Sequence, residues 1–336
     1  MRQTMWVAAG VVLAAAALAA ATAAGGVAGF LWGARMGGLA RWDAPAERYL
    51  SGEGPEKIAV VRVVGPISRE GRGVALLGTG ASSRALVALL ERARRDPAIR
   101  AVIVELDTPG GSVVASDELY QALVALRRAG KPVVALLTEV AASGGYYVAA
   151  AADHIVAAPT TVTGSIGVIV ALANTEALSR KIGVRTIVFK SGAFKDLGNP
   201  NRPMTPAEAA IVQRLVDEAY ARFVEAVARG RRMDPARVRR LADGRIYTGL
   251  QAQRLGLVDS LGHLPAAVTI AMRRAGLAQA TVVEYGAGGG LLQALLGALG
   301  RSLPVGWDAV DPAPVPEATG AALAGWGLSV QYLMVP

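Results

Sequence analysis

The sequence predicts an α/β fold whose core is a mostly parallel sheet built from repeated βαβ units. Runs rich in β-branched residues alternate with segments of helical apolar spacing along the middle of the chain, and that alternation is typical of parallel sheets. The strand-like runs are apolar at consecutive positions, as expected for strands that are covered on both faces. The 336 residues are enough for one large or two ordinary domains.

The first half of the predicted domain contains three strands and two helices. "KIAVVRVVGPI" (57–67) has the β-branched density of a strand, and 83–96 has apolar residues at helical spacing. "IRAVIVELDTPGGS" (99–112) is predicted as a buried strand ending in Pro-Gly-Gly, and 115–130 as a helix that a glycine stops. "KPVVALLTEV" (131–140) is the next buried strand, and it runs directly into a Ser-Gly-Gly sequence.

The second half continues the alternation, with short strands within 153–170, a helix at 174–183, a strand at 184–192 and a long helix at 205–230. The long helix opens with Thr205 as its cap and has Glu208 three residues on, which is the pattern of a capping box. Further helices are predicted in "DPARVRRLADG" and "LPAAVTIAMRRAG".

The amino-terminal residues predict a transmembrane anchor. Between Arg2 and Arg35 lie 32 residues without a charge, more than the roughly 20 apolar residues that span a bilayer. We therefore assign residues 1–4 to a short tail and residues 5–34 to an uncleaved anchor. The alternative is a cleaved signal peptide, although the charge-free run is much longer than the usual ~7–15-residue signal core.

The rest of the chain divides by composition into three segments. Residues 35–56 are rich in proline, glycine and charge and are predicted to form a stalk, residues 57–285 form the folded domain, and residues 286–336 are a tail. The tail is rich in Gly, Ala and Pro with apolar patches, and the sequence assigns it no role.

Composition excludes several classes of function. The chain has no cysteine, which excludes disulfides and thiolate metal sites, and we expect neither a metal nor a cofactor. The net charge of +9 comes without a long basic run or a basic patch interleaved with aromatic residues, so nucleic acid is not an expected partner. Of 35 basic residues only five are lysines. Arginine cannot act as a general base, whereas a desolvated lysine can.

Two glycine-rich corners follow the two buried strands and suggest acyl-transfer chemistry. Ser143 stands before Gly144 at the end of one strand, and Gly110 and Gly111 follow the other. Ser143 is the candidate nucleophile, Gly144 supplies one oxyanion N–H, and Gly110 or Gly111 supplies another. The alternative is that each corner is merely a tight turn with close backbone packing.

The base that would activate Ser143 is sought among two histidines and the few lysines. His154 and His263 have no evident carboxylate to orient them, except Asp153, which would point elsewhere on a strand. Lys195 stands in a loop, "SGAFKDLGNP", where functional residues are often carried, and a serine–lysine dyad needs an amine that is neutral when it meets substrate. The alternative for Lys195 is a loop lysine paired with the adjacent aspartate.

Four motifs in order resemble those of the signal peptide peptidase A family: "ELDTPGGSV", "AASGGYYVAAAADHIVAAPTTVTGSIGV", "KSGAFKDLGNPNRPMT" and "ADGRIYTGLQAQRLGLVDSLG". The resemblance covers residues 57–275 and the anchor. It implies that Ser143 is the nucleophile and Lys195 the base. It further implies that Ser165 hydrogen-bonds the lysine amine and that the Pro-Gly-Gly corner is the oxyanion loop.

The family resemblance also implies a fold, a location and partners. The fold would be that of the Clp proteases and crotonases, with the catalytic domain on the extracytoplasmic side of the cell membrane. The substrates would be remnant signal peptides and other apolar peptides. The chain would form a ring of identical subunits in which neighbours contribute the serine and the lysine. Two alternatives stay open: a crotonase-like acyl-transfer enzyme, and a catalytically silent membrane scaffold of the same fold.

Overall fold

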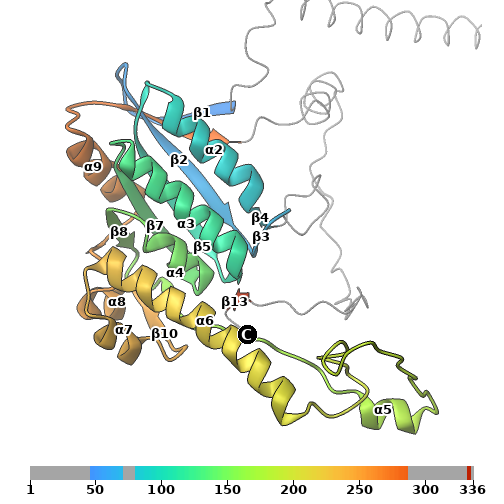
Figure 1. The fold of residues 1–336 in the computed structure, drawn as a ribbon. Coiled ribbons are helices and arrows are strands. Elements are labelled where there is room, and N and C mark those ends of the chain that lie inside the picture. Colours follow the sequence, from blue (N-terminus) through green and yellow to red (C-terminus); the bar gives the residue numbers. More distant parts are fainter. Residues whose placement is uncertain (1–45, 71–79, 287–330, 334–336) are drawn as a thin grey trace, which may run out of the picture. The chain divides into compact units, whose positions relative to one another are not determined.

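The structure is a computed structural model that describes residues 46–70, 80–286 and 331–333 (Figure 1). The chain divides into two units, residues 1–44 and 45–336, and all described residues belong to the second. The predicted anchor, residues 5–34, lies outside the described residues. Within the described ranges, every helix is too short or too polar to cross a bilayer.

The core of the described part is a nine-stranded, mostly parallel sheet, which confirms the predicted α/β class. Its main path runs β1-β12-β2-β5-β7-β8-β11, and β9 and β10 continue from the end of β7. All neighbours are parallel except β1 on β12 and β10 on β9. The strands are β1 Ala46–Ser51, β2 Lys57–Val64, β5 Ile99–Thr108, β7 Val133–Ala142, β8 His154–Ala157, β9 Val162–Gly164, β10 Ile246–Thr248, β11 Ser260–Leu261 and β12 Thr281–Gly286.

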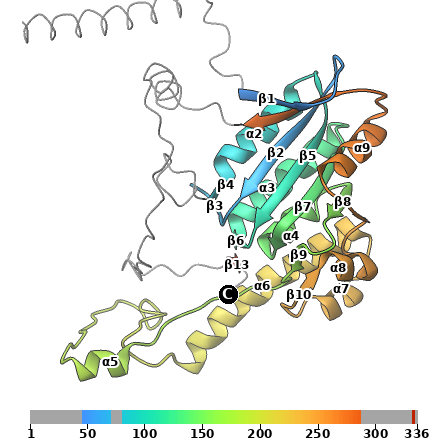
Figure 2. The same ribbon diagram turned by 180° about the vertical axis from the view of Figure 1, so that it is seen from behind.

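Helices cover both faces of this sheet, as Figures 1 and 2 show from opposite sides. On one face lie α2, α3, α4 and α6, and on the other lies α9. The helices are α2 Ser83–Arg95, α3 Val113–Arg128, α4 Gly144–Ala149, α5 Glu176–Lys181, α6 Pro206–Arg231, α7 Pro235–Leu241, α8 Gly249–Leu255 and α9 Leu264–Ala275. The predicted capping box of α6 is present, with Thr205 and Glu208 bonding each other's backbone N–H groups.

Burial on both faces explains the consecutive apolar residues in the strands. Along β5, Val102 and Val104 point into the cluster beneath α2 and α3, while Ala101 and Ile103 point into the cluster beneath α9. All four side chains are fully buried, so neither face of the strand can carry a polar residue there. The carboxyl halves of the strands are less apolar than their amino halves on the α9 face. Beyond the end of α9 this face carries polar side chains such as Glu105.

A second, four-stranded sheet begins where β5 ends. Its order is β13-β6-β3-β4, with β3 Ile67–Ser68, β4 Ala81–Ser82, β6 Gly110–Ser112 and β13 Gln331–Leu333. The predicted strand 99–112 is therefore two strands, because Pro109 has no N–H to donate and interrupts the ladder. The glycines that follow turn β6 into the smaller sheet.

Two segments differ from what the sequence predicted. No strand forms at residues 184–192, where Ile187 and Phe189 are exposed in spite of their β-propensity. A strand needs a neighbouring strand or an apolar surface as well as propensity, and this segment has neither among the described residues. Strand β1 lies within residues 35–56, the predicted stalk, and pairs with β12 at the sheet edge.

Candidate active site

Ser143 links β7 to α4 in a strained backbone conformation. Its φ is 53° and its ψ is −117°, a region that residues other than glycine rarely occupy. Two hydrogen bonds hold it there: its own N–H donates to the Gly164 carbonyl at 2.8 Å, and the Tyr147 N–H donates to the Ser143 carbonyl at 2.9 Å. Strain of this kind persists only where the surroundings fix it, and it concentrates at functional sites.

The Ser143 hydroxyl is buried and unsatisfied. The residue is 1% exposed, and its Oγ has no hydrogen-bond partner among the described residues. A buried hydroxyl without a partner costs about 1–3 kcal/mol, so its presence calls for an explanation. A nucleophile that waits for a base and a substrate is one such explanation.

The glycines after Ser143 allow α4 to pack against the end of β5. A Cβ on Gly145 would lie 2.7 Å from Thr108 Cγ2 and 3.2 Å from the Thr108 carbonyl oxygen. Gly144 is the first residue of α4, and the first amides of a helix have no acceptor within it. The Gly144 N–H therefore lies directly after Ser143, the candidate nucleophile, at a position where an oxyanion donor would be needed.

The Pro-Gly-Gly corner lies beside Ser143 because β5 and β7 are neighbouring parallel strands. Thr108 at the end of β5 pairs with Ala141 near the end of β7. The Gly110 N–H donates to Thr108 Oγ1 at 3.1 Å, which closes the corner. Gly111 approaches β3 so closely that a Cβ there would lie 2.0 Å from the Ile67 carbonyl oxygen. Gly111 is thus required by this close approach, and Gly110 by its φ of 103°.

Ser165 stands next to Ser143 at the end of the neighbouring strand. Ala142 pairs with Gly164 in the β7–β9 ladder, so the two serines each follow a paired residue. Ser165 has a φ of 49°, is 8% exposed, and donates its N–H to the Arg245 carbonyl at 2.8 Å. Among the described non-glycine residues only Ser143, Ser165 and Arg232 have positive φ. The structure therefore brings Ser143, Ser165 and the two glycine corners together.

Lys195 is not part of this group within one chain. Its side chain is exposed and makes no hydrogen bond or ion pair with any described residue. It belongs to the segment between α5 and α6, which lies at the far end of α6 from α4 (Figures 1 and 2). Its neighbour Asp196 pairs instead with Lys190 at 2.7 Å and with Arg202 at 2.9 Å, so the alternative in which Lys195 is a loop lysine paired with Asp196 is not supported.

The segment that carries Lys195, residues 172–204, is here called the arm. It presents apolar side chains to solvent, and Phe189 is the extreme case at 94% exposure. The other exposed apolar residues of the arm are Leu172, Leu178, Ile182, Val184, Ile187, Val188, Phe194 and Met204. So many exposed apolar side chains in one short segment are typical of an interaction site in a folded protein.

A cluster of charged side chains fixes the arm where it meets α6. The sequence analysis did not identify this cluster. Arg202 donates to Asp196 at 2.9 Å and to both carboxylate oxygens of Glu208, at 2.9 and 2.5 Å. The Arg202 guanidinium lowers the pKa of Glu208 to about 2 and holds the pKa of Asp196 well below its usual range. The signal for this cluster in the sequence is an arginine that lies shortly before the capping box of α6. The exposed arm is therefore anchored firmly where it meets α6.

His154 lies far from Ser143. His154 is level with Val134 on β7, nine residues before Ser143, which corresponds to about 30 Å along a strand. Its Nε2 lies 2.9 Å from Ser260 Oγ, and burial lowers its pKa.

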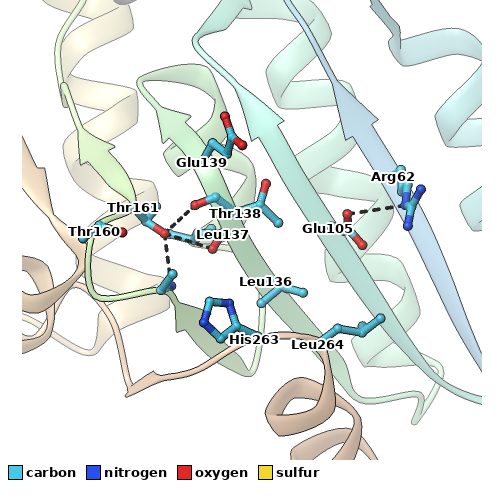
Figure 3. Close-up of a pocket in the computed structure, with 11 residues that line it drawn as sticks. Arg62, Glu105, Leu136, Leu137, Thr138, Glu139, Thr160, Thr161, His263 and Leu264 are labelled. Atoms are coloured by element: carbon cyan, nitrogen blue, oxygen red, sulfur yellow. Dashed lines mark hydrogen bonds and ion pairs between the residues drawn. The ribbon is translucent and has the colours of Figure 1, made fainter.

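His263 lines a pocket of about 560 Å³ on the α9 face of the sheet (Figure 3). The pocket floor is formed by the carboxyl halves of β2, β5 and β7, and an ion pair of 3.4 Å joins Arg62 to Glu105 at one side. Ser143 does not line this pocket. Among the described residues no cluster of three His, Cys, Asp or Glu side chains could hold a metal ion.

The chain is similar to known peptidases. Residues 125–278 match Peptidase family S49. The "Putative signal peptide peptidase SppA" of Enterococcus faecium is 36% identical over 239 residues, which cover 71% of this chain and 70% of that one. The "Putative protease slr0021" of Synechocystis sp. is 42% identical over 207 residues, 62% of this chain and 70% of that one. "Protease 4" of Salmonella typhi is 34% identical over 241 residues, 69% of this chain and 38% of that one.

Proposed function

Because the chain belongs to peptidase family S49, we propose that it is a membrane-anchored serine endopeptidase that uses a Ser143–Lys195 dyad. The single observation that carries the proposal is the state of Ser143: it is strained and buried, its Oγ has no partner among the described residues, and it lies beside the Pro-Gly-Gly corner. Its proposed substrates are apolar peptides at the membrane, remnant signal peptides among them.

The proposed reaction is acyl transfer through a serine ester. Ser143 Oγ attacks the carbonyl carbon of the scissile peptide while Lys195 Nζ takes the hydroxyl proton and passes it to the leaving amine. The oxyanion is stabilised by the Gly144 N–H and by the Gly110–Gly111 corner. Water then attacks the ester with the same amine as base, which releases the acid and restores Ser143. Ser165, beside the nucleophile, would hold the amine in position.

We propose that Lys195 reaches Ser143 of a second copy of the chain. Two observations support this: in one chain the arm lies at the far end of α6 from α4 (Figure 1), and the arm exposes apolar side chains that a second subunit would cover. Docking of a neighbour's arm would complete the active site and would also bury the apolar side chains of that arm. A closed ring of identical contacts satisfies this requirement for every subunit.

The anchor and the location are part of the same proposal. The 32 uncharged residues between Arg2 and Arg35 are the support, and they would hold the catalytic domain on the extracytoplasmic face of the cell membrane. The protein is then expected to stay in the membrane fraction after washing with carbonate. Release of a shortened domain that begins near Gly25 would show instead that a signal peptide is cleaved.

Labelling with a serine-reactive phosphonate tests the nucleophile. The chain offers a matched control, because Ser116 is the other buried serine whose Oγ has no partner among the described residues. Ser143→Ala is expected to abolish labelling and peptide cleavage, and Ser116→Ala to keep both. Cleavage by Ser143→Ala within about tenfold of the parent would contradict the assignment, since loss of a nucleophile costs far more. A parent that neither labels nor cleaves would favour a crotonase-like enzyme or a silent scaffold.

A further inference from the structure

The last of the four sequence motifs, residues 242–262, has no part in the proposed reaction, yet it lies beside the nucleophile. Its strand β10 pairs antiparallel with β9 (Figure 2), and β9 pairs with the end of β7, the strand that leads to Ser143. Strands β9 and β10 therefore support the candidate active site from one side.

One peptide unit connects this support to the nucleophile. The carbonyl of Gly164 accepts the Ser143 N–H at 2.8 Å. The N–H of the same peptide belongs to Ser165 and donates to the Arg245 carbonyl at 2.8 Å. The orientation of the Gly164–Ser165 peptide thus sets the backbone at both serines.

This peptide is held in a strained orientation. Gly164 has a φ of 82° and Ser165 a φ of 49°, and the second value is uncommon for a residue other than glycine. A half-turn of the peptide would change the φ of Ser165 from 49° to about −131°, which lies in the broad β region. That flip would relieve the strain at Ser165 and would break both hydrogen bonds, so the surrounding structure has to oppose it.

The ring of Tyr247 is packed against this peptide. A Cβ at position 164 would lie 2.6 Å from Tyr247 Cδ2 and 3.2 Å from its Cε2, so the ring already fills the space beside Gly164. Tyr247 is 8% exposed, and its hydroxyl donates to the carbonyl of Leu241, the last residue of α7, at 2.9 Å. The ring is therefore fixed by β10 at one end and by α7 at the other.

We propose that Tyr247 is a positioning residue for the nucleophile: by packing on Gly164 it keeps the Gly164–Ser165 peptide in the orientation that the two serines need. The inference rests on the proposed peptidase function. Tyr247 acts through the backbone of Gly164 and is not itself a catalytic group. The alternative is an aromatic side chain that merely covers a glycine across two strands. That alternative predicts a loss of stability without a specific loss of kcat.

Loss of the ring has a defined signature. With the peptide free to flip, Ser143 spends less time in the reactive geometry, and a change of this kind lowers kcat and kcat/KM equally. We expect kcat to fall at least about tenfold while the KM stays within about threefold of the parent. The Ser143 amide would lose its acceptor for part of the time, so its hydrogen exchange should be at least about tenfold faster.

The experiment compares the full-length parent with three variants, Tyr247→Leu, Tyr247→Phe and Tyr285→Leu. Tyr247→Phe keeps a ring on Gly164 and is expected to retain kcat within about threefold. Tyr285→Leu is the matched control, because Tyr285 is also a buried tyrosine, 2% exposed, on β12, which β2, β5 and β7 separate from β9. Cleavage of an uncharged peptide ester gives kcat and KM, and mass spectrometry of overlapping peptides gives the exchange of the Ser143 amide.

Amide exchange and phosphonate labelling of Ser143 separate the two proposals. Lower kcat and faster exchange in Tyr247→Leu, with neither change in Tyr285→Leu, support the positioning role. Unchanged exchange in Tyr247→Leu, an equal loss of kcat in Tyr285→Leu, or a Tyr247→Phe as slow as Tyr247→Leu would overturn it, and the peptidase function would stand as long as the parent labels. If no form labels or cleaves, the peptidase function is overturned and the positioning role with it.

Discussion

Gly145→Ala tests whether the contact between α4 and the Pro-Gly-Gly corner sets the geometry of catalysis. The new Cβ would lie 2.7 Å from Thr108 Cγ2, and ordinary contact begins at 3.4 Å, so the two groups must separate by about 0.7 Å. Thr108 Oγ1 accepts the Gly110 N–H, so the displacement moves the Pro-Gly-Gly corner, the second proposed source of oxyanion donors, away from Ser143.

A displacement of this size has a large effect on rate and a smaller effect on stability. A misplacement of about 1 Å can cost a hundredfold in rate, so we expect kcat/KM to fall between about tenfold and a hundredfold. The free energy of unfolding is expected to fall by about 1–2 kcal/mol, because overpacking is partly offset by the better helix propensity of alanine.

Gly130→Ala is the control for stability. Gly130 follows α3 with a φ of 78°, and a Cβ there would meet nothing within 4 Å. Its substitution costs about 1–2 kcal/mol through the backbone alone, at a position remote from the serines. We would measure guanidinium unfolding and peptide-ester cleavage of both variants well below their melting temperatures. The reasoning fails if Gly145→Ala keeps kcat/KM within twofold of the parent, or if Gly130→Ala loses as much as Gly145→Ala.

Three further predictions concern the arm, the lysine that it carries and the Arg202 cluster where it meets α6. Inactive Ser143→Ala and Lys195→Ala chains, co-assembled in equal amounts, should regain about a quarter of the parent activity, because a shared dyad finds both partners in one site of four; no recovery would place the dyad within one chain. Lys195→Arg should be as inactive as Lys195→Ala, since guanidinium cannot accept a proton, whereas Lys190→Arg keeps the pairing with Asp196 and should stay active. The pKa of Glu208 is lowered from 4.5 to about 2, so its contribution to stability is present above pH 4.5 and lost as the pH falls toward 2. The difference in urea midpoint between the parent and Glu208→Gln should therefore shrink across that range, and a constant difference would refute the pairing.

The sheet could be predicted from the sequence because its signals are local and repeated. Buried apolar residues stand at consecutive positions in the middle of β5, from Ala101 to Val104, because both faces are covered there, and the cap of α6 needs only Thr205 and Glu208. Ser143 and the Pro-Gly-Gly corner could be placed at the ends of two buried strands for the same reason, since parallel strands end at one edge of a sheet. Ser165 was assigned only through the family resemblance.

The arm and the C-terminal strand could not be predicted, because their partners are distant. Residues 184–192 have the propensity of a strand, and only the absence of a neighbouring strand among the described residues leaves them outside the sheet. Strand β13 lies more than two hundred residues from β6 in sequence, and no local pattern specifies such a pairing. The Arg202 cluster was missed because an arginine in a loop is most often solvated.

The separation of Lys195 from the serines bears on whether a newly synthesised single chain could cleave other proteins. A newly synthesised chain carries its proposed nucleophile near α4 and its proposed base at the far end of α6, so alone it would behave as a zymogen without any propeptide. Proteolysis would switch on only when enough copies have gathered in one membrane. The activity per chain would then rise with surface density and vanish on dilution.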